Sequence, residues 1–264
     1  MPNDKRRSDA GNLQVTDRDI LVLTWNGEQY ACTFAHLQRL LAEHSPEEGK
    51  DLLSISATRN AVQRWLYLGL IEEPRKFRAG QTKYIWLSRR GLSEIGLPYP
   101  YYVPKLKSLA HIHAVNEVRL AIQGSNVWIP KRTLRIAAAR EGGEDIAGLP
   151  DAEFYERSRT PVAIVVVEKP ESEKDLVTLI DKVLKRYDSL RCYIHRDNVE
   201  VMRSIRAAFD HPADLQLYDL ENMRDVTEEA DSLRGDEACP APGQNSASII
   251  AAQPESHTRR KKQS

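Results

Sequence analysis

Cysteine is scarce in this sequence, and long apolar segments are missing. Cys32, Cys192 and Cys239 lie far apart and form no Cys-x-x-Cys pair, which argues against a disulfide framework and a cysteine zinc site. No apolar run approaches the ~20 residues that a membrane-spanning helix needs. The segment MPNDKRRSDAGNLQ has no apolar stretch of the secretory kind. These absences favour a soluble protein of a reducing, cytoplasmic compartment, without membrane partners.

An excess of one charge is also absent. Lys and Arg together number 38, and Asp and Glu together number 38, which excludes a uniformly basic, histone-like mode of binding. The charges are nevertheless segregated. Residues 16–55 contain three basic and seven acidic residues, a net charge of −4, whereas residues 56–92 contain eight basic and two acidic residues, a net charge of +6. The sequence therefore predicts a local basic patch in the second segment.

Composition divides the chain into two domains between two tails. Residues 1–15 and 223–264 have few large apolar residues and are predicted to be disordered. Residues 97–105 carry three prolines and three tyrosines and are expected to form a connector. We therefore expect domains at 16–100 and 101–222. The second tail ends in a basic run, which we interpret first as solvated and second as a weak phosphate-binding arm: Arg259, Arg260, Lys261 and Lys262.

The first domain shows the pattern of three helices followed by a hairpin. Thr16, Thr33 and Ser56 are placed to cap these helices, and apolar residues recur after each of them at helical spacing. Strand-like residues follow at 82–87, and Ser88 is placed to cap a short closing helix. This order is typical of a winged helix-turn-helix.

The basic patch falls on the third helix and the hairpin of this domain. In a winged helix these parts meet the major groove and the flanking phosphates, and Arg, Asn and Gln have the forked geometry that matches guanine and adenine edges. Double-stranded DNA is therefore the expected partner. The alternative is a protein-interaction winged helix with a solvated basic face. The residues expected to contact DNA are Arg59, Asn60, Gln63 and Arg64 on the helix and Arg75, Lys76, Arg78 and Lys83 on the wing.

The second domain alternates helix and strand patterns. The run PVAIVVVEK at 161–169 is apolar on both faces, which predicts a central strand. The other expected elements are a helix at 105–123, strands at 127–129 and 133–138, a Gly-rich loop leading to PDAEFY, a helix at 173–187, a strand at 190–195, a helix at 199–209 and an edge strand in ADLQLYDL. We predict an α/β (α+β) fold with a mixed αβββαβαβ sheet domain, an order similar to the core of the PD-(D/E)xK nucleases.

Three carboxylates of this domain are candidate catalytic residues. Nucleases of that kind use clustered carboxylates to bind a divalent metal that activates water. Asp151 begins a strand, Glu168 ends the central strand, and Glu117 lies on the first helix. Asp151 and Glu168 would be the ligands of Mg²⁺ or Mn²⁺ if the domain is catalytic. However, Val166 stands where a carboxylate is expected, and Lys169 points to the other face of the strand, so we expect an inactive nuclease-like domain.

A nickase is the other enzymatic alternative that the sequence offers. His111 and His113 have the His-x-His spacing of rolling-circle nickases, and Tyr187 would be the nucleophile. The pair falls on a helical pattern, on which side chains at i and i+2 diverge by roughly 200° and cannot share a metal. No Walker A, GxGxxG, GxSxG or HExxH motif is present, which leaves nucleotide-driven and common hydrolase chemistry without support.

The order of the motifs resembles that of the replication-relaxation family of plasmids and integrated elements. The resemblance covers about residues 16–220 and rests on TDRDILVL, NAVQRWLYLGLIE, YIWLSRRGLSEIG, LAHIHAVNEVRLAI, WIPKRTLR, PDAEF and the helix ending in KRYDSL. It implies a winged helix fused to a nuclease-like domain. The central strand of that family usually contains Glu-x-Glu, and Val166 departs from it, which leaves Glu168 as the matching position. His111, Asn116 and Glu117 match its first helix of the second domain.

Three functions are consistent with these observations. The first is a DNA-binding protein of a plasmid or integrated mobile element that controls replication, maintenance or transfer, together with replication or transfer proteins of the same element. The second is a metal-dependent endonuclease or nickase, and the third is a protein-interaction adaptor. Winged helices often bind DNA as dimers, so a homodimer is left open, although the sequence contains no dedicated dimerisation element.

Overall fold

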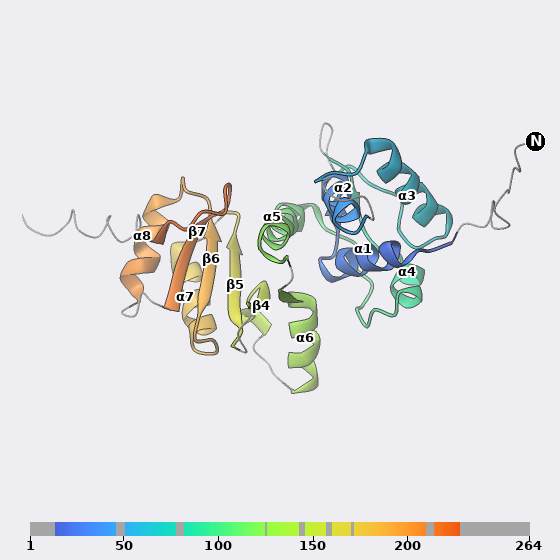
Figure 1. The fold of residues 1–264 in the computed structure, drawn as a ribbon. Helices are drawn as coiled ribbons and strands as arrows, with labels where there is room; N and C mark the ends of the chain where they lie inside the picture. Colours follow the sequence, from blue (N-terminus) through green and yellow to red (C-terminus); the bar gives the residue numbers. More distant parts are fainter. Residues whose placement is uncertain are drawn as a thin grey trace, which may run out of the picture.

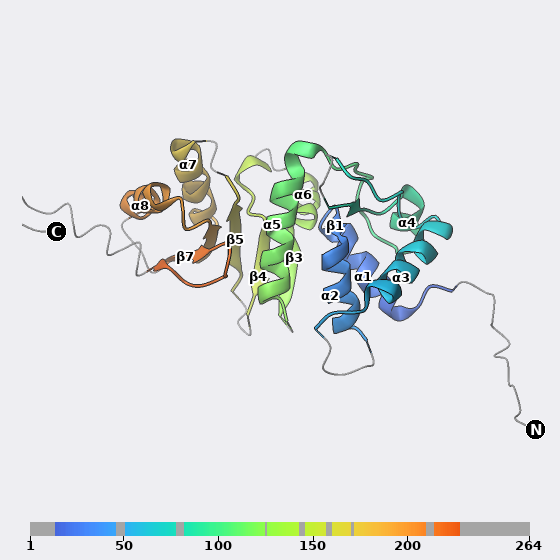
Figure 2. The ribbon, with the colours of Figure 1, turned by 90° about the horizontal axis from the view of Figure 1, so that it is seen from above.

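The computed structural model describes residues 14–45, 51–77, 82–124, 126–142, 146–156, 160–169, 172–209 and 214–227. This part of the chain contains eight α-helices and two β-sheets, arranged as two lobes with one long helix between them (Figures 1 and 2). The fold is therefore mixed, of the α+β kind. Among these helices, none is both long and apolar enough to cross a membrane. Most of both predicted tails, with the basic run at 259–262, lies outside the described residues.

The helical lobe consists of four helices and a two-stranded antiparallel sheet. Its elements are α1 (Asp17–Glu28), β1 (Cys32–Thr33), α2 (Phe34–Glu43), α3 (Ile55–Tyr67), β2 (Tyr84–Ile85) and α4 (Arg89–Glu94). Antiparallel bridges join Ile71 to Leu87 and Arg75 to Tyr84. We call the described parts of residues 71–87 the hairpin.

Side-chain caps fix where the helices of this lobe begin. The predicted caps Thr16, Thr33 and Ser88 are confirmed, because each accepts a hydrogen bond from the backbone N–H three residues on. The predicted cap Ser56 is wrong. Ser54 caps α3 instead, with its hydroxyl accepting from the N–H of Ala57 at 3.2 Å. The backbone of Ser54 is extended, whereas Ser56 already lies within the helix. The helix α3 therefore begins two residues earlier than expected.

A buried carboxylate joins α1 to α3. Asp19 is fully buried and accepts hydrogen bonds from the guanidinium of Arg64 at 2.7 Å and from the indole Nε1 of Trp65 at 2.9 Å. Its second role is local, because its carboxylate also accepts from the N–H of Thr16 at 2.8 Å, which completes a capping box. Around this group packs the core of the lobe, which includes Leu37 and Leu41 of α2.

The sheet lobe is built on a five-stranded mixed sheet. In spatial order its strands are β3 (Val127–Pro130), β4 (Ala152–Tyr155), β5 (Val162–Val167), β6 (Leu190–Ile194) and β7 (Leu215–Asp219). The first three are antiparallel, and β5, β6 and β7 are parallel. Its helices are α5 (Leu106–Ile122), α6 (Lys131–Arg140), α7 (Glu173–Leu184) and α8 (Val199–Ala208). Side chains of α7 and α8 pack on one face of the sheet and those of α5 on the other.

One predicted strand of this lobe is wrong. Residues 133–138 belong to helix α6, which follows β3 without a loop. Pro130 occupies the N-cap position, and the alanine-rich segment after it favours a helix. The described order is therefore αβαββαβαβ, with a short 3₁₀ turn at Ile146–Gly148 before β4. The other predicted helices and strands of the second domain are present, with ends displaced by a few residues.

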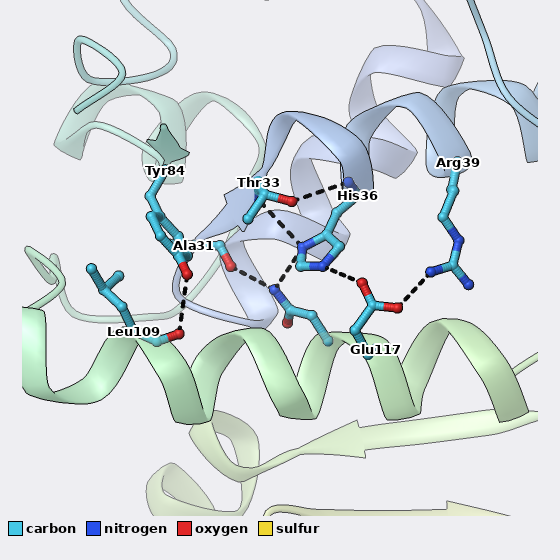
Figure 3. Close-up of polar contacts among 8 residues, drawn as sticks. Ala31, Thr33, His36, Arg39, Tyr84, Leu109 and Glu117 are labelled. Atoms are coloured by element: carbon cyan, nitrogen blue, oxygen red, sulfur yellow. Dashed lines mark hydrogen bonds and ion pairs between the residues drawn. The ribbon is translucent and has the colours of Figure 1, made fainter. Parts of the chain in front are cut away.

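The helix α5 carries polar side chains that bind the helical lobe (Figure 3). Asn116 is buried, and its amide donates to the carbonyl of Ala31 at 2.8 Å. Glu117 accepts from the ring Nε2 of His36 at 2.8 Å and from the guanidinium of Arg39 at 2.8 Å. Because α2 supplies both of these donors, the contact joins α2 to α5 directly.

Two buried arginines extend this junction. Arg119 of α5 pairs with Glu28 at the end of α1, at 2.7 Å. Arg132 of α6 donates to the carbonyls of Gly27 and Pro100. Both side chains are almost fully buried, so each needs these acceptors to offset the cost of leaving water. The two lobes are therefore joined by specific polar contacts as well as by apolar packing.

We predict that Asp19→Asn lowers the free energy of unfolding by about 3–5 kcal/mol, because it leaves Arg64 without its buried partner. Urea unfolding followed by tryptophan fluorescence measures this change, with Trp65 as the nearest reporter. Asp17→Asn is the matched control, since Asp17 is an exposed carboxylate of the same helix turn. Equal stability of Asp19→Asn and wild type would contradict the assignment.

We also predict a pH-dependent effect at the junction. The hydrogen bond from His36 and the charge and hydrogen bond of Arg39 lower the pKa of Glu117 to about 2 against the opposing effect of burial. The ionised form therefore stabilises the fold above the ordinary pKa of 4.5 and stops doing so as the pH falls towards about 2. Glu117→Gln should be less stable than wild type at neutral pH, and the difference should narrow below pH 4.5 in urea unfolding. A difference that does not change with pH would refute this prediction.

Candidate functional site

The outer side of α3 presents an exposed polar stripe. Arg59, Asn60 and Gln63 are exposed, and the side of the helix that carries Ala61 and Trp65 is buried. Tyr67 continues the stripe one turn later and is 79% exposed. Tyr67 is not among the residues that were expected to contact DNA, although its spacing of four residues from Gln63 indicates the same face of the helix.

Arg64 has a different environment from the rest of the stripe. Its side chain is 22% exposed, and its guanidinium binds the buried Asp19. We therefore leave Arg64 out of the proposed interface and assign it to the core of the helical lobe. Sequence spacing did not reveal this pairing, because its partner lies 45 residues earlier in the chain.

The hairpin carries further exposed cations, Arg75, Lys76 and Lys83. Arg75 is fixed by backbone hydrogen bonds of 3.1 and 2.9 Å with Tyr84, and its guanidinium lies over the ring of Trp86. Arg78 lies outside the described residues. A groove of about 370 Å³ runs between α2, α3 and the hairpin. It is lined by Phe34, Arg59, Val62, Gln63, Pro74, Lys83 and Ile85. The structure thus brings Arg59 and Gln63 of α3 and Lys83 of the hairpin to one groove.

A second cluster surrounds Asp151, at the start of β4. Its Oδ1 accepts from His111 Nε2 at 2.9 Å and from Lys131 Nζ at 3.1 Å, and its Oδ2 accepts from the N–H of Val166 at 2.9 Å. Burial by itself would raise the pKa of Asp151, but the positive charges of Lys131 and His111 outweigh it and lower that pKa well below its ordinary value. Asp151 in turn raises the pKa of His111, against the effect of burial. We call Asp151, His111 and Lys131 the Asp151 cluster.

The three predicted catalytic carboxylates do not come together. Glu117 lies on the side of α5 that faces the helical lobe, where it binds His36 and Arg39 (Figure 3). Glu168 follows β5, is exposed, and is near enough to influence the pKa of His111. The structure therefore associates Glu168, but not Glu117, with the Asp151 cluster.

The donor set around Asp151 does not fit a divalent cation. Both of its oxygens already accept hydrogen bonds, and two of the three donors, Lys131 and His111, are cationic or become so on protonation. A metal ion bound to Asp151 would have to displace these groups and would be repelled by their positive charge. The role of Asp151 as a ligand of Mg²⁺ or Mn²⁺ therefore gains no support from these residues.

The residues of the nickase alternative are also separated. His111 binds Asp151, whereas His113 stacks on His36 at 4.8 Å between ring centroids. The two side chains diverge, as expected for neighbours at i and i+2 on a helix. Tyr187 lies beyond α7, where its hydroxyl donates to Glu153 at 2.7 Å. Asp151, two residues before Glu153, instead contacts His111 of α5 and Lys131 of α6.

His36, His113 and Glu117 form the one group of potential metal ligands among the described residues, with ligand atoms within 4.8 Å of one another. The Nδ1 of His36 accepts the N–H of Thr33 at 3.2 Å. A neutral ring with this bond carries its proton on Nε2, which donates to Glu117. No lone pair of His36 is then left for a metal, so we interpret the group as a structural contact.

Comparisons with family models, curated proteins and solved structures give no significant match to this chain. The resemblance to the replication-relaxation family therefore rests on the sequence motifs alone.

We predict that His111 titrates above its ordinary pKa of 6.5 and that Asp151→Asn lowers this value, because the negative charge is removed. The ion pair with His111 stabilises the fold below pH 6.5 and is lost as the pH rises through the raised pKa. NMR titration of the imidazole protons measures the shift, with His111→Gln for assignment. His113 is the internal control, since its pKa is lowered by burial and by His36 and should not respond. An unchanged His111 titration in Asp151→Asn would contradict the prediction.

Proposed function

We propose that this protein binds double-stranded DNA through α3 and the hairpin, in the manner of a winged helix-turn-helix. The element order α1-β1-α2-α3-β2 agrees with such a domain. The observation that carries the proposal is the exposed polar stripe of α3, from which Arg59 and Gln63 line one groove together with Lys83 of the hairpin. The two cations of this groove suit an anionic partner.

The chemistry of the stripe suits DNA. Arg59, Asn60 and Gln63 have the side chains that bind guanine and adenine edges in the major groove. In this proposal Lys83, which lines the same groove, and the exposed Arg75 and Lys76 of the hairpin contact phosphates, and such contacts fix the register of a protein on the duplex. Tyr67 adds an exposed ring with a polar tip at the end of the same helix.

In this proposal the sheet lobe is a nuclease-like scaffold without catalytic function. Its mixed sheet, with helices on both faces, agrees with such a core, while its buried carboxylate Asp151 is bound by Lys131 and His111. Because polar contacts of α5 and α6 tie it to the helical lobe, it moves with the DNA-binding surface. Together with the sequence motifs, this arrangement supports a role in replication control, maintenance or transfer of a plasmid or integrated element.

DNA affinity across a salt series tests the proposal. Each phosphate contact contributes a slope of about −0.9 to log K against log salt. We predict that Arg59→Gln/Lys83→Gln weakens binding to random duplex DNA and makes this slope about 1.8 shallower. Fluorescence anisotropy with labelled duplexes measures both quantities.

The matched control is Arg90→Gln/Lys185→Gln, which removes two exposed cations that lie outside α3 and the hairpin. Its slope should equal that of wild type. Weak binding with a slope that neither variant changes would refute DNA binding by this surface. It would instead favour the protein-interaction adaptor, with Tyr67 and the same groove as the contact.

A further inference from the structure

A small pocket opens beside the Asp151 cluster, where the two lobes meet. Its volume is about 180 Å³. The pocket is lined by residues from the end of α1, the connector, α5 and α6. They include Tyr30, Ser108, His111, Lys131 and Arg135. With about 30 Å³ for each water molecule in the liquid, the pocket has room for about six waters. It is smaller than the ~300 Å³ at which pockets for drug-sized ligands begin, so its ligand is a small group.

The charges on the pocket wall are mainly positive. Lys131, Arg135 and His111 line it together with two acids, Asp151 and Glu28. Asp151 is 7% exposed and already binds Lys131 and His111, whereas Glu28 pairs with Arg119 at 2.7 Å. Asp151 therefore acts as a buried counterion that fixes two cations at the pocket wall.

The backbone at the pocket adds to this positive potential. The first turns of α5 and α6 contribute Ser108 and Lys131 to the lining. Neither helix has a side-chain cap hydrogen bond at its start, and the positive end of each helix dipole favours an anion there. The hydroxyl of Tyr30 accepts from Arg135 at 3.2 Å, which positions that guanidinium at the rim.

We propose that this pocket binds a phosphate group, with Lys131 and Arg135 as its main ligands and Ser108 as a hydroxyl donor. A phosphate offers several acceptor oxygens to donors that converge from different elements. The raised pKa of His111 favours a third cation near neutral pH. The pocket is lined by no residue of α3 or of the hairpin, so this inference does not rest on the proposed DNA binding.

Calorimetry on the full chain with inorganic phosphate tests the proposal. We expect one phosphate to bind per chain and to shift the NMR resonances of the His111 ring. Arg135→Gln should weaken binding about tenfold, as expected for the loss of one charge-assisted hydrogen bond. Arg135 is exposed, so this variant keeps the fold intact. Lys131→Gln should weaken binding at least as much, and its thermal unfolding shows whether it folds.

Two control variants distinguish this site from other cationic surfaces. Arg140→Gln removes an exposed arginine from the end of the same helix α6, and Arg59→Gln/Lys83→Gln removes the proposed DNA contacts. Both should bind phosphate as wild type does. The proposal is overturned if phosphate fails to bind wild type at millimolar concentration, if Arg135→Gln binds it normally, or if either control variant loses it.

A competition experiment identifies the natural source of the phosphate. A short single-stranded oligonucleotide with a 5′-phosphate is compared with the same strand ending in a 5′-hydroxyl. Displacement of inorganic phosphate by the first strand alone supports the site and assigns it to a nucleic-acid end. If neither strand competes while inorganic phosphate binds as expected, the site stands as one for a small phosphate compound.

Discussion

The burial of α5 between the two lobes is the constraint on which the rest of the structure depends. A helix covered on one side by a sheet and on the other by helices must satisfy every polar group that it buries. The amide nitrogen of Asn116, the carboxylate of Glu117 and the guanidinium of Arg119 find acceptors and donors in the helical lobe, whereas Oδ1 of Asn116 has no partner. Breaking one of these hydrogen bonds leaves a buried donor or acceptor with neither a protein partner nor water, at a cost of about 1–3 kcal/mol. This cost makes the relative placement of the lobes specific. The opposite side of α5 packs on the sheet, where His111 lies beside Asp151.

Local features of the fold were predictable from the sequence, because their causes are local. Thr16, Thr33 and Ser88 cap helices through bonds to residues three positions away, and the apolar run at 161–169 contains β5. The assignment of 133–138 as a strand failed because a short segment of alternating residues fits either structure, and Pro130 together with the contacts of α6 decides between them.

The candidate sites were predictable only in part, because side-chain partners depend on contacts between distant residues. The basic segment at 56–92 correctly indicated exposed cations on α3 and the hairpin. It did not distinguish Arg59, which lies on the exposed stripe, from Arg64, which binds a buried carboxylate of another helix. The Asp151 cluster was likewise hidden, since its members come from α5, α6 and β4. Only the fold shows that Lys131 and not Lys169 lies beside Asp151.

The charge around Asp151 determines which ligand that end of the sheet is suited to accept. A carboxylate that faces water or other carboxylates attracts a divalent cation, whereas one that already binds two cations is surrounded by net positive charge. Asp151 is of the second kind, because His111 and Lys131 both bind its Oδ1. Arg135 and the first turns of α5 and α6 extend the positive potential into the adjoining pocket. An arrangement that would repel the metal of a nuclease is therefore suited to bind the oxygens of a phosphate.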